Sequence, residues 1–270
     1  MTIKLRLEEP RDYREVEEIT REAFWGQGRA RCDEHYLAHL LRKSPCFVPE
    51  LDYVTEINGK LVGNVMFSKA KIVIPSETNS DGIEHEVLTF GPISVLPEYQ
   101  NKGVGKALLQ RTIEEARSLG FRAIVIFGEP DYYPRLGFKR AAEFGILTSW
   151  GGTLDAFMAR PLVEGAFDGL AGGVYFQDEV YNVNAEEAYK FDMKFPDKTE
   201  HILLPIDILP VIISKELRDA FTEKNITLLD DLNRFSGREL SEFPGMRREW
   251  FAAVDECLIQ NGLAAKTWPK

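Results

Sequence analysis

Gln100-Asn101-Lys102-Gly103-Val104-Gly105 is the stretch that decides the fold of this 270-residue chain. It follows an apolar run typical of a strand, at residues 93–97, and it opens an amphipathic helix expected from about Val104 to Leu119. The first N–H groups of a helix have no internal partners, and the helix dipole places positive potential there. A glycine-bearing turn at that end therefore predicts a cradle of backbone N–H groups for a phosphate or pyrophosphate.

Two better-known phosphate motifs do not fit this stretch. The Walker loop requires Ser or Thr after Gly-Lys, whereas Ala107 follows Gly105-Lys106, and Gln100 stands where that motif has its first glycine. The Rossmann fingerprint requires G-x-G-x-x-G, and only the short G-x-G is present. The turn therefore belongs to another class of nucleotide-binding site.

Two motifs give the chain a family resemblance. The pattern Q-x-x-G-x-G directly after a strand resembles the acetyl-CoA-binding signature of the GNAT superfamily of N-acetyltransferases, which is Q/R-x-x-G-x-G/A. Further on, residues 132–138 (YYPRLGF) look like the Y-x-x-x-G-F segment that follows the fifth strand in that family. Each motif lies in the structural setting that the family would give it.

The order of the expected elements agrees with this resemblance. Strands and helices alternate as β-α-α-β-β-β-α-β-α-β-β over residues 1–162, with a hairpin signal at Asn58-Gly59 and a strand expected near residues 139–147. We therefore expect an α+β fold, a GNAT-type mixed and splayed sheet flanked by helices. Gly91-Pro92 interrupts a strand and suggests a bulge that opens a slot beside it.

The resemblance implies how acetyl-CoA, a co-substrate, would bind. Backbone groups of the strand would pair with the pantetheine amides, as an added strand does. The N–H groups of the turn would hold the pyrophosphate, and two lysines would add positive charge near the phosphates. The expected cofactor-binding residues are Ile93, Ser94, Val95, Gln100, Asn101, Lys102, Gly103, Val104, Gly105 and Lys106.

The resemblance also implies catalytic roles. Tyr133 stands where the family places the general acid for the CoA thiolate, and Tyr132 is the neighbouring alternative. Some members carry a glutamate base six residues before the Val95 position, but Thr89 stands there in this chain. Glu129, at the end of the fifth strand, is the preferred candidate for the base, because strand ends face the cleft in open α/β sheets, and Glu86 is the alternative.

Composition limits the other possibilities. The net charge of −10 disfavours nonspecific binding to nucleic acid and favours a cationic substrate such as an amine. No apolar run approaches the ~20 residues of a membrane helix. Three cysteines without a C-x-x-C pair suggest a reduced, cytoplasmic protein. His35 and His39 have a spacing that can hold a metal, but no third ligand is evident, so no metal is expected.

The C-terminal part differs in kind. We expect residues 163–206 to form an extension on the sheet and a connector, and residues 207–270 to form a small all-helical domain with caps at Ser214, Ser236 and Asn261-Gly262. The run from residue 225 to 251 resembles the helix-hairpin-helix domain at the C-terminus of the bacterial RNA polymerase α subunit. Its hairpin lacks a second glycine, so protein contact or homo-oligomerisation is favoured over nucleic-acid binding.

The sequence thus predicts an N-acetyltransferase that moves an acetyl group from acetyl-CoA to a primary amine by direct attack. The acceptor would be a small molecule or a peptide. The alternative is a catalytically inactive acyl-CoA-binding regulatory protein, whose helical tail binds a protein or nucleic acid.

Overall fold

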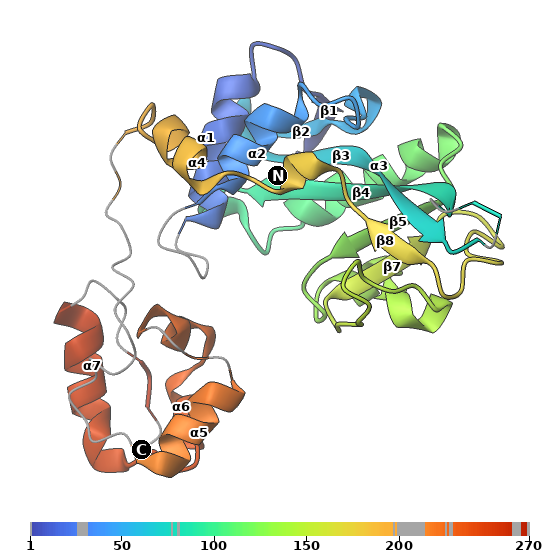
Figure 1. Cartoon of the computed structure of the whole chain (residues 1–270). Coiled ribbons are helices and arrows are strands. Elements are labelled where there is room, and N and C mark those ends of the chain that lie inside the picture. The colour runs from blue at the N-terminus through green and yellow to red at the C-terminus, as the bar shows by residue number, and fades with distance from the viewer. Residues whose placement is uncertain are drawn as a thin grey trace. The chain divides into compact units, whose positions relative to one another are not determined.

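The computed structural model describes most of the chain (Figure 1). Contacts divide the chain into two compact units, Met1–Phe24 with Asp33–Pro196, and Trp25–Cys32 with Asp197–Lys270. The described residues are 2–25, 32–76, 78–79, 82–196, 198, 214–224, 226, 229–260 and 266–268, without the side chains of 230, 233 and 234.

The first unit is built on one mixed sheet. Its order is β1-β2-β3-β4-β5-β7-β6, and β8 pairs with β3 off this path. All the pairs are antiparallel except β4 with β5. The strands are β1 (Lys4–Leu7), β2 (Tyr53–Ile57), β3 (Lys60–Ile74), β4 (Ile83–Val95), β5 (Ala123–Phe127), β6 (Lys139–Arg140), β7 (Phe157–Pro161) and β8 (Val174–Phe176).

Helices cover both faces of the sheet. The Ser94 side chain of β4 donates to the Thr20 hydroxyl of α1 (Tyr13–Phe24) at 3.0 Å, so α1 lies on the Ser94 face, where α2 (Glu34–Leu41) packs beside it. A Cβ added at Gly63, which pairs with Val95, would instead meet α3 (Val104–Ser118). Successive residues point to opposite faces, so α3 lies on the other face. The expected α+β class and the mixed sheet flanked by helices are confirmed.

Strands β4 and β5 diverge after a short contact. Their parallel pairing is confined to Leu88 and Ile124. Beyond it, β4 carries the Gly91-Pro92 pair, and the register of β4 on β3 shifts at Val65–Phe67. The end of β4 therefore stays paired with β3 on one side, while its other edge no longer pairs with β5; we call the gap between the two diverging strands the slot.

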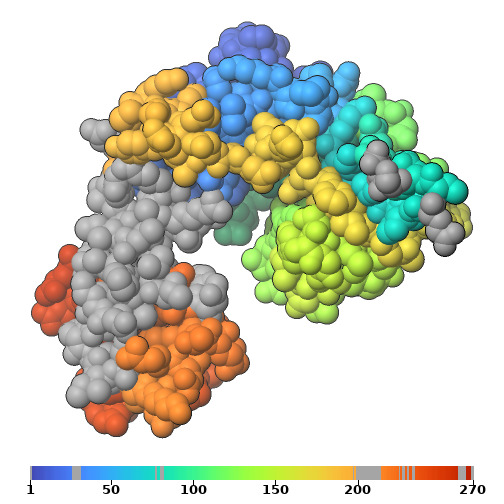
Figure 2. Space-filling view, viewed as in Figure 1, coloured from blue at the N-terminus to red at the C-terminus, as the bar shows by residue number. Residues whose placement is uncertain are grey.

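The stretch after β7 remains part of the first unit. Strand β8 extends the sheet at β3, and α4 (Ala185–Asp192) packs on α2. Arg21 of α1, only 4% exposed, makes a bidentate ion pair with Asp192 of α4, at 2.6 and 3.0 Å. In Figure 2 the yellow-to-orange surface of this segment lies against the blue surface of α1 and α2.

The second unit contains α5 (Lys215–Glu223), α6 (Gly237–Ser241) and α7 (Phe251–Gln260) around an apolar cluster that includes Leu217, Leu240 and Leu258. Ser214 caps α5, and Ser236 with Glu239 forms the expected capping box of α6. The expected cap at Asn261-Gly262 lies outside the described residues. The likeness to a helix-hairpin-helix domain stays a prediction, as do the domain limits at 162 and 207.

One expected strand is wrong in extent. Strand β6 covers only Lys139–Arg140, and Ala141–Phe144 form a 3₁₀ helix. Ala141 is fully buried and Gly145 ends the turn at a φ of +71°. The apolar residues here fill the core from a turn, a pattern that resembles a buried strand in sequence. Among the described residues, no helix is both long enough and apolar enough to cross a membrane.

Candidate functional site

The start of α3 forms the expected cradle. Asn101 and Gly103 both have a positive φ, of +58° and +86°, and this turns the chain sharply into the helix. In the described chain, the first backbone hydrogen bond of the helix runs from Ala107 N–H to the Gly103 carbonyl, at 3.0 Å. The N–H groups of Val104, Gly105 and Lys106 precede it and have no helical carbonyl to receive them. They supply donors for an anion at the positive end of the helix dipole.

The other expected cofactor-binding residues surround this cradle. Ile93, Ser94 and Val95 form the end of β4, and the edge of the strand that does not pair with β3 faces the slot. The Gln100 side chain donates to the Val95 carbonyl at 3.0 Å, which ties the cradle to the end of this strand. Lys102 and Lys106 are exposed on either side of Gly103, so both are accessible to a phosphate.

Two tyrosines flank the slot after β5. A Cβ added at Gly105 would lie 3.4 Å from the Tyr132 hydroxyl, so that hydroxyl reaches the cradle. The Tyr133 ring packs over Gly128 and contacts the rings of Phe90 and Phe138, with centroids 5.8 and 5.6 Å away. The structure thus brings both tyrosines beside the slot, Tyr132 nearer to α3 and Tyr133 between β4 and β5.

Burial sets the protonation of these tyrosines. It raises the pKa of Tyr133 well above the usual value, and the nearby Tyr132 and Glu129 add to the rise. Burial also raises the pKa of Tyr132, and Arg135 partly offsets this. Both hydroxyls therefore keep their protons at neutral pH and can act as donors.

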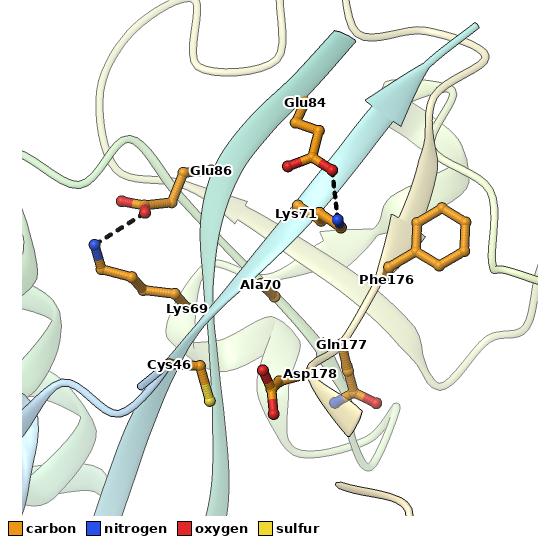
Figure 3. A pocket seen from close by; sticks show the side chains of 9 residues that line it. All are labelled: Cys46, Lys69, Ala70, Lys71, Glu84, Glu86, Phe176, Gln177 and Asp178. Atoms are coloured by element: carbon orange, nitrogen blue, oxygen red, sulfur yellow. Dashed lines mark hydrogen bonds and ion pairs between the residues drawn. The ribbon is translucent and has the colours of Figure 1, made fainter. Parts of the chain in front are cut away.

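The candidate bases lie in different places. Glu86 forms an ion pair with Lys69 at 3.0 Å and lines a hollow of about 410 Å³ on the sheet, together with Cys46 and Asp178 (Figure 3). Thr89 is buried and points to the opposite face of β4, because it lies three positions after Glu86 on the strand. Glu129 is exposed just after the end of β5. Glu86 lies before the point where β4 and β5 part, whereas Glu129 follows the end of β5, beside the slot.

Sequence reasoning missed two tyrosines whose hydroxyls bind the backbone of the strands that border the slot. The Tyr175 hydroxyl of β8 donates to the Val125 carbonyl at 3.4 Å, beside the point where β4 and β5 part. The Tyr181 hydroxyl contacts Ser68 at 2.7 Å and donates to the Gly91 carbonyl at 3.5 Å. The available signal was the aromatic run in residues 174–181, which had no assigned role.

The two histidines of α2 are engaged separately. His35 Nε2 lies 3.1 Å from an Asp192 oxygen, and His39 Nδ1 lies 2.9 Å from a Glu17 oxygen. Among the described residues, no group of three or more His, Cys, Asp or Glu side chains could hold a metal ion. The three cysteines are buried.

Comparisons with known proteins agree with this geometry. Residues 11–138 match the model of the acetyltransferase (GNAT) family. YhbS of Escherichia coli strain K12, described as an uncharacterized N-acetyltransferase, is 26% identical over 174 residues, which are 64% of this chain and 96% of YhbS. YjhQ of the same strain, described in the same way, is 35% identical over 94 residues, which are 35% of this chain and 49% of YjhQ.

Two crystal structures resemble the first unit. YhbS of Escherichia coli in complex with CoA superposes with a TM-score of 0.58 at 25% identity, over 67% of this chain and 92% of that one. A GNAT acetyltransferase from Brucella melitensis in complex with acetyl-CoA superposes with a TM-score of 0.52 at 25% identity, over 67% of this chain and 98% of that one. Motif, fold and relatives agree: residues 11–138 are similar in sequence to the acetyltransferase (GNAT) family, and the first unit resembles two of its crystal structures in fold.

Proposed function

We propose that the protein transfers an acetyl group from acetyl-CoA to a primary amine by direct attack. The observation that carries the proposal is the donor cradle at the start of α3, which adjoins the slot between β4 and β5. The relatives crystallised with CoA and with acetyl-CoA support the choice of co-substrate.

The cofactor would occupy the cradle and the slot together. The N–H groups of Gly103, Val104, Gly105 and Lys106 would hold the pyrophosphate, with the exposed Lys102 and Lys106 adding charge. The pantetheine arm would then run along the free edge of Ile93–Val95 and pair with its backbone groups. The thioester would then lie near the two tyrosines.

The chemistry needs positioning more than covalent help. The amine nitrogen attacks the thioester carbonyl and forms the C–N bond, the C–S bond breaks, and the thiolate takes a proton from a tyrosine hydroxyl. We assign that donor to Tyr133, with Tyr132 as the alternative because its hydroxyl lies beside Gly105. The amine loses its proton to water. The exposed Glu129, four residues before Tyr133, is the candidate acceptor of that proton from the water.

The direct test measures thiol release from acetyl-CoA over a panel of primary amines. We expect turnover above the hydrolysis background with at least one amine, and a fall in kcat of about 10²-fold in Tyr133→Phe, since general acid catalysis contributes 10²–10⁴-fold. Tyr132→Phe is the matched control and should change kcat by less than about threefold. The reverse ranking would move the role to Tyr132, and binding of CoA without turnover on any amine would contradict the proposal.

A further inference from the structure

We propose that the acceptor amine carries an aromatic ring and that Trp150 and Phe127 bind this ring. The inference rests on the proposed function and names the substrate class of the same site. It starts from a stacked aromatic pair that the structure leaves exposed at the end of β5.

The pair is large, flat and accessible. Trp150 is 63% exposed and Phe127 is 40% exposed, and their ring centroids lie 5.8 Å apart at an interplanar angle of 22°. Phe157 continues the stack behind Phe127, with centroids 5.0 Å apart at 28°. Leu154, 49% exposed, follows on the same turn. We call Trp150 and Phe127 the aromatic platform.

The turn that carries Trp150 is firmly built. The Thr148 hydroxyl donates to the Gly152 carbonyl at 2.9 Å and accepts from the Gly152 N–H at 3.1 Å. The backbone adds bonds from Thr148 N–H to Gly152 and from Gly151 N–H to Thr148. This network fixes the backbone of the turn that carries Trp150.

The platform begins at the end of β5, the strand on one side of the slot. Phe127 ends β5 and contacts the Tyr175 ring, with centroids 6.1 Å apart, and the Tyr175 hydroxyl binds Val125 where the slot opens. Tyr133 and Phe138 pack instead with the buried cluster that contains Ile124 and Ile126 of β5 and residues of α3. A cofactor in the slot on the α3 side would therefore present its thioester to an acceptor that rests on the platform.

Charge and ring chemistry identify the occupant. Glu129 is exposed and follows Phe127 by two residues, and the chain has a net charge of −10, which attracts an ammonium group. An aromatic ring stacks favourably on Phe and Trp, by about 0.5–1.5 kcal/mol beyond its buried area. An amine with an aromatic ring a few bonds away satisfies both features, whereas an aliphatic amine would leave Trp150 unused.

The test compares phenethylamine with n-butylamine, using full-length protein and acetyl-CoA. We expect kcat/KM for phenethylamine to be at least tenfold higher. Trp150→Ala should remove about tenfold of that through KM, with less than a twofold change for n-butylamine, and Trp150→Phe should restore most of it. Leu119→Ala, which truncates another exposed apolar side chain at the far end of α3, is the control and should change neither value.

A binding measurement separates this inference from the proposed function. Calorimetry with phenethylamine and the CoA-bound protein should give heat that Trp150→Ala abolishes, whether or not acetyl transfer follows. Binding without turnover would support the platform and contradict the proposed function. Equal use of both amines by wild type and Trp150→Ala would overturn the inference, as would a sedimentation result in which Trp150→Ala dissociates a dimer.

Discussion

Gly103 and Gly120 stand at the two ends of α3 and make a matched pair of residues. Their φ angles are +86° and +88°, and a Cβ added at either would meet no atom within 4 Å. Alanine at either position should therefore lower the free energy of unfolding by about 1 kcal/mol through backbone strain alone. Only Gly103 lies in the cradle, so only Gly103→Ala should weaken CoA binding, by about tenfold or more.

Chemical denaturation and calorimetric titration with CoA measure the two effects separately. Equal losses of CoA affinity in both variants would mean that the loss comes from general destabilisation of α3. The cradle would then not be the anion site. Unchanged affinity in Gly103→Ala would remove the pyrophosphate from this turn.

The burial of Tyr133 leads to a prediction about how kcat depends on alkaline pH. Because burial raises its pKa well above the usual value, its hydroxyl should stay protonated up to about pH 10. We expect kcat to show no alkaline fall below that pH, if Tyr133 is the general acid. The measurement is a kcat profile from pH 7 to 10. A fall with an apparent pKa near 9 that Tyr133→Phe abolishes would show that the hydroxyl is not shielded.

The glycine turn could be predicted from sequence because its chemistry depends on backbone conformation and local order. Gly103 and Gly105 were recognisable from six consecutive letters. Tyr175 and Tyr181 could not be found in this way, because their roles come from long-range pairing. Tyr175 contacts Val125, 50 residues earlier, and Tyr181 contacts Gly91, 90 residues earlier.

At the scale of elements, the buried ion pair between α1 and α4 is the strongest link that the sequence left hidden. Arg21 and Asp192 are 171 residues apart and both lie in the interior. Asp192→Ala would leave the Arg21 charge buried without its carboxylate, which costs about 3–5 kcal/mol. The expected result is a clear drop in the thermal midpoint of the first unit.

Lys190→Ala on the same helix is the control for that experiment. Lys190 pairs with Glu186 at the exposed surface, so its loss should change stability by less than about 0.5 kcal/mol. If the two variants melt alike, α4 contributes little to the stability of the first unit.

The same interface should respond to acid. His35 lies among Asp192, Arg21, Asp33 and Arg14, and burial lowers its pKa from 6.5 to about 4. Below pH 6.5 the unfolded chain takes up a proton that the folded one refuses until about pH 4. Stability should therefore fall over this window, by roughly 3 kcal/mol. Thermal midpoints at pH 7 and pH 4 measure this fall.

His35→Phe should flatten that dependence, because a phenylalanine fits beside Phe191 and Phe195 and carries no proton. His85→Gln serves as the control. His85 lies on β4 and is more exposed than His35, so this variant should show the same acid response as the wild type. An acid response that survives in His35→Phe would assign it to other groups.

The element pattern itself was largely predictable. Helices α1, α2 and α3 and the long strands have clear periodicity, and the Asn58-Gly59 turn marks their hairpin. The segment after Lys139 was mistaken for a strand, since a buried 3₁₀ turn and a buried strand share the same apolar letters. Strand β8 was missed because three residues carry no period, and only pairing with β3 defines it.

At the scale of the whole molecule, the extent of the folding unit decides which fragments are stable. The compact unit runs to Pro196, and the alignment with YhbS spans 174 residues, more than residues 1–162 contain. Removing residues after 162 would take Phe167, Leu170 and Tyr175 out of a buried cluster and would remove Asp192, which forms an ion pair with Arg21. We therefore expect a 1–162 fragment to lack a cooperative melting transition.

A 1–196 fragment should behave differently, because it retains that cluster, β8 and α4. It should melt cooperatively and bind CoA within about twofold of the intact chain, because the cradle and slot residues lie within the first unit. Calorimetric melting and CoA titration of both fragments and the intact chain provide the comparison. A folded, CoA-binding 1–162 fragment would show that residues 163–196 are accessory, and a 1–196 fragment that folds without binding CoA would assign the C-terminal unit a part in the site.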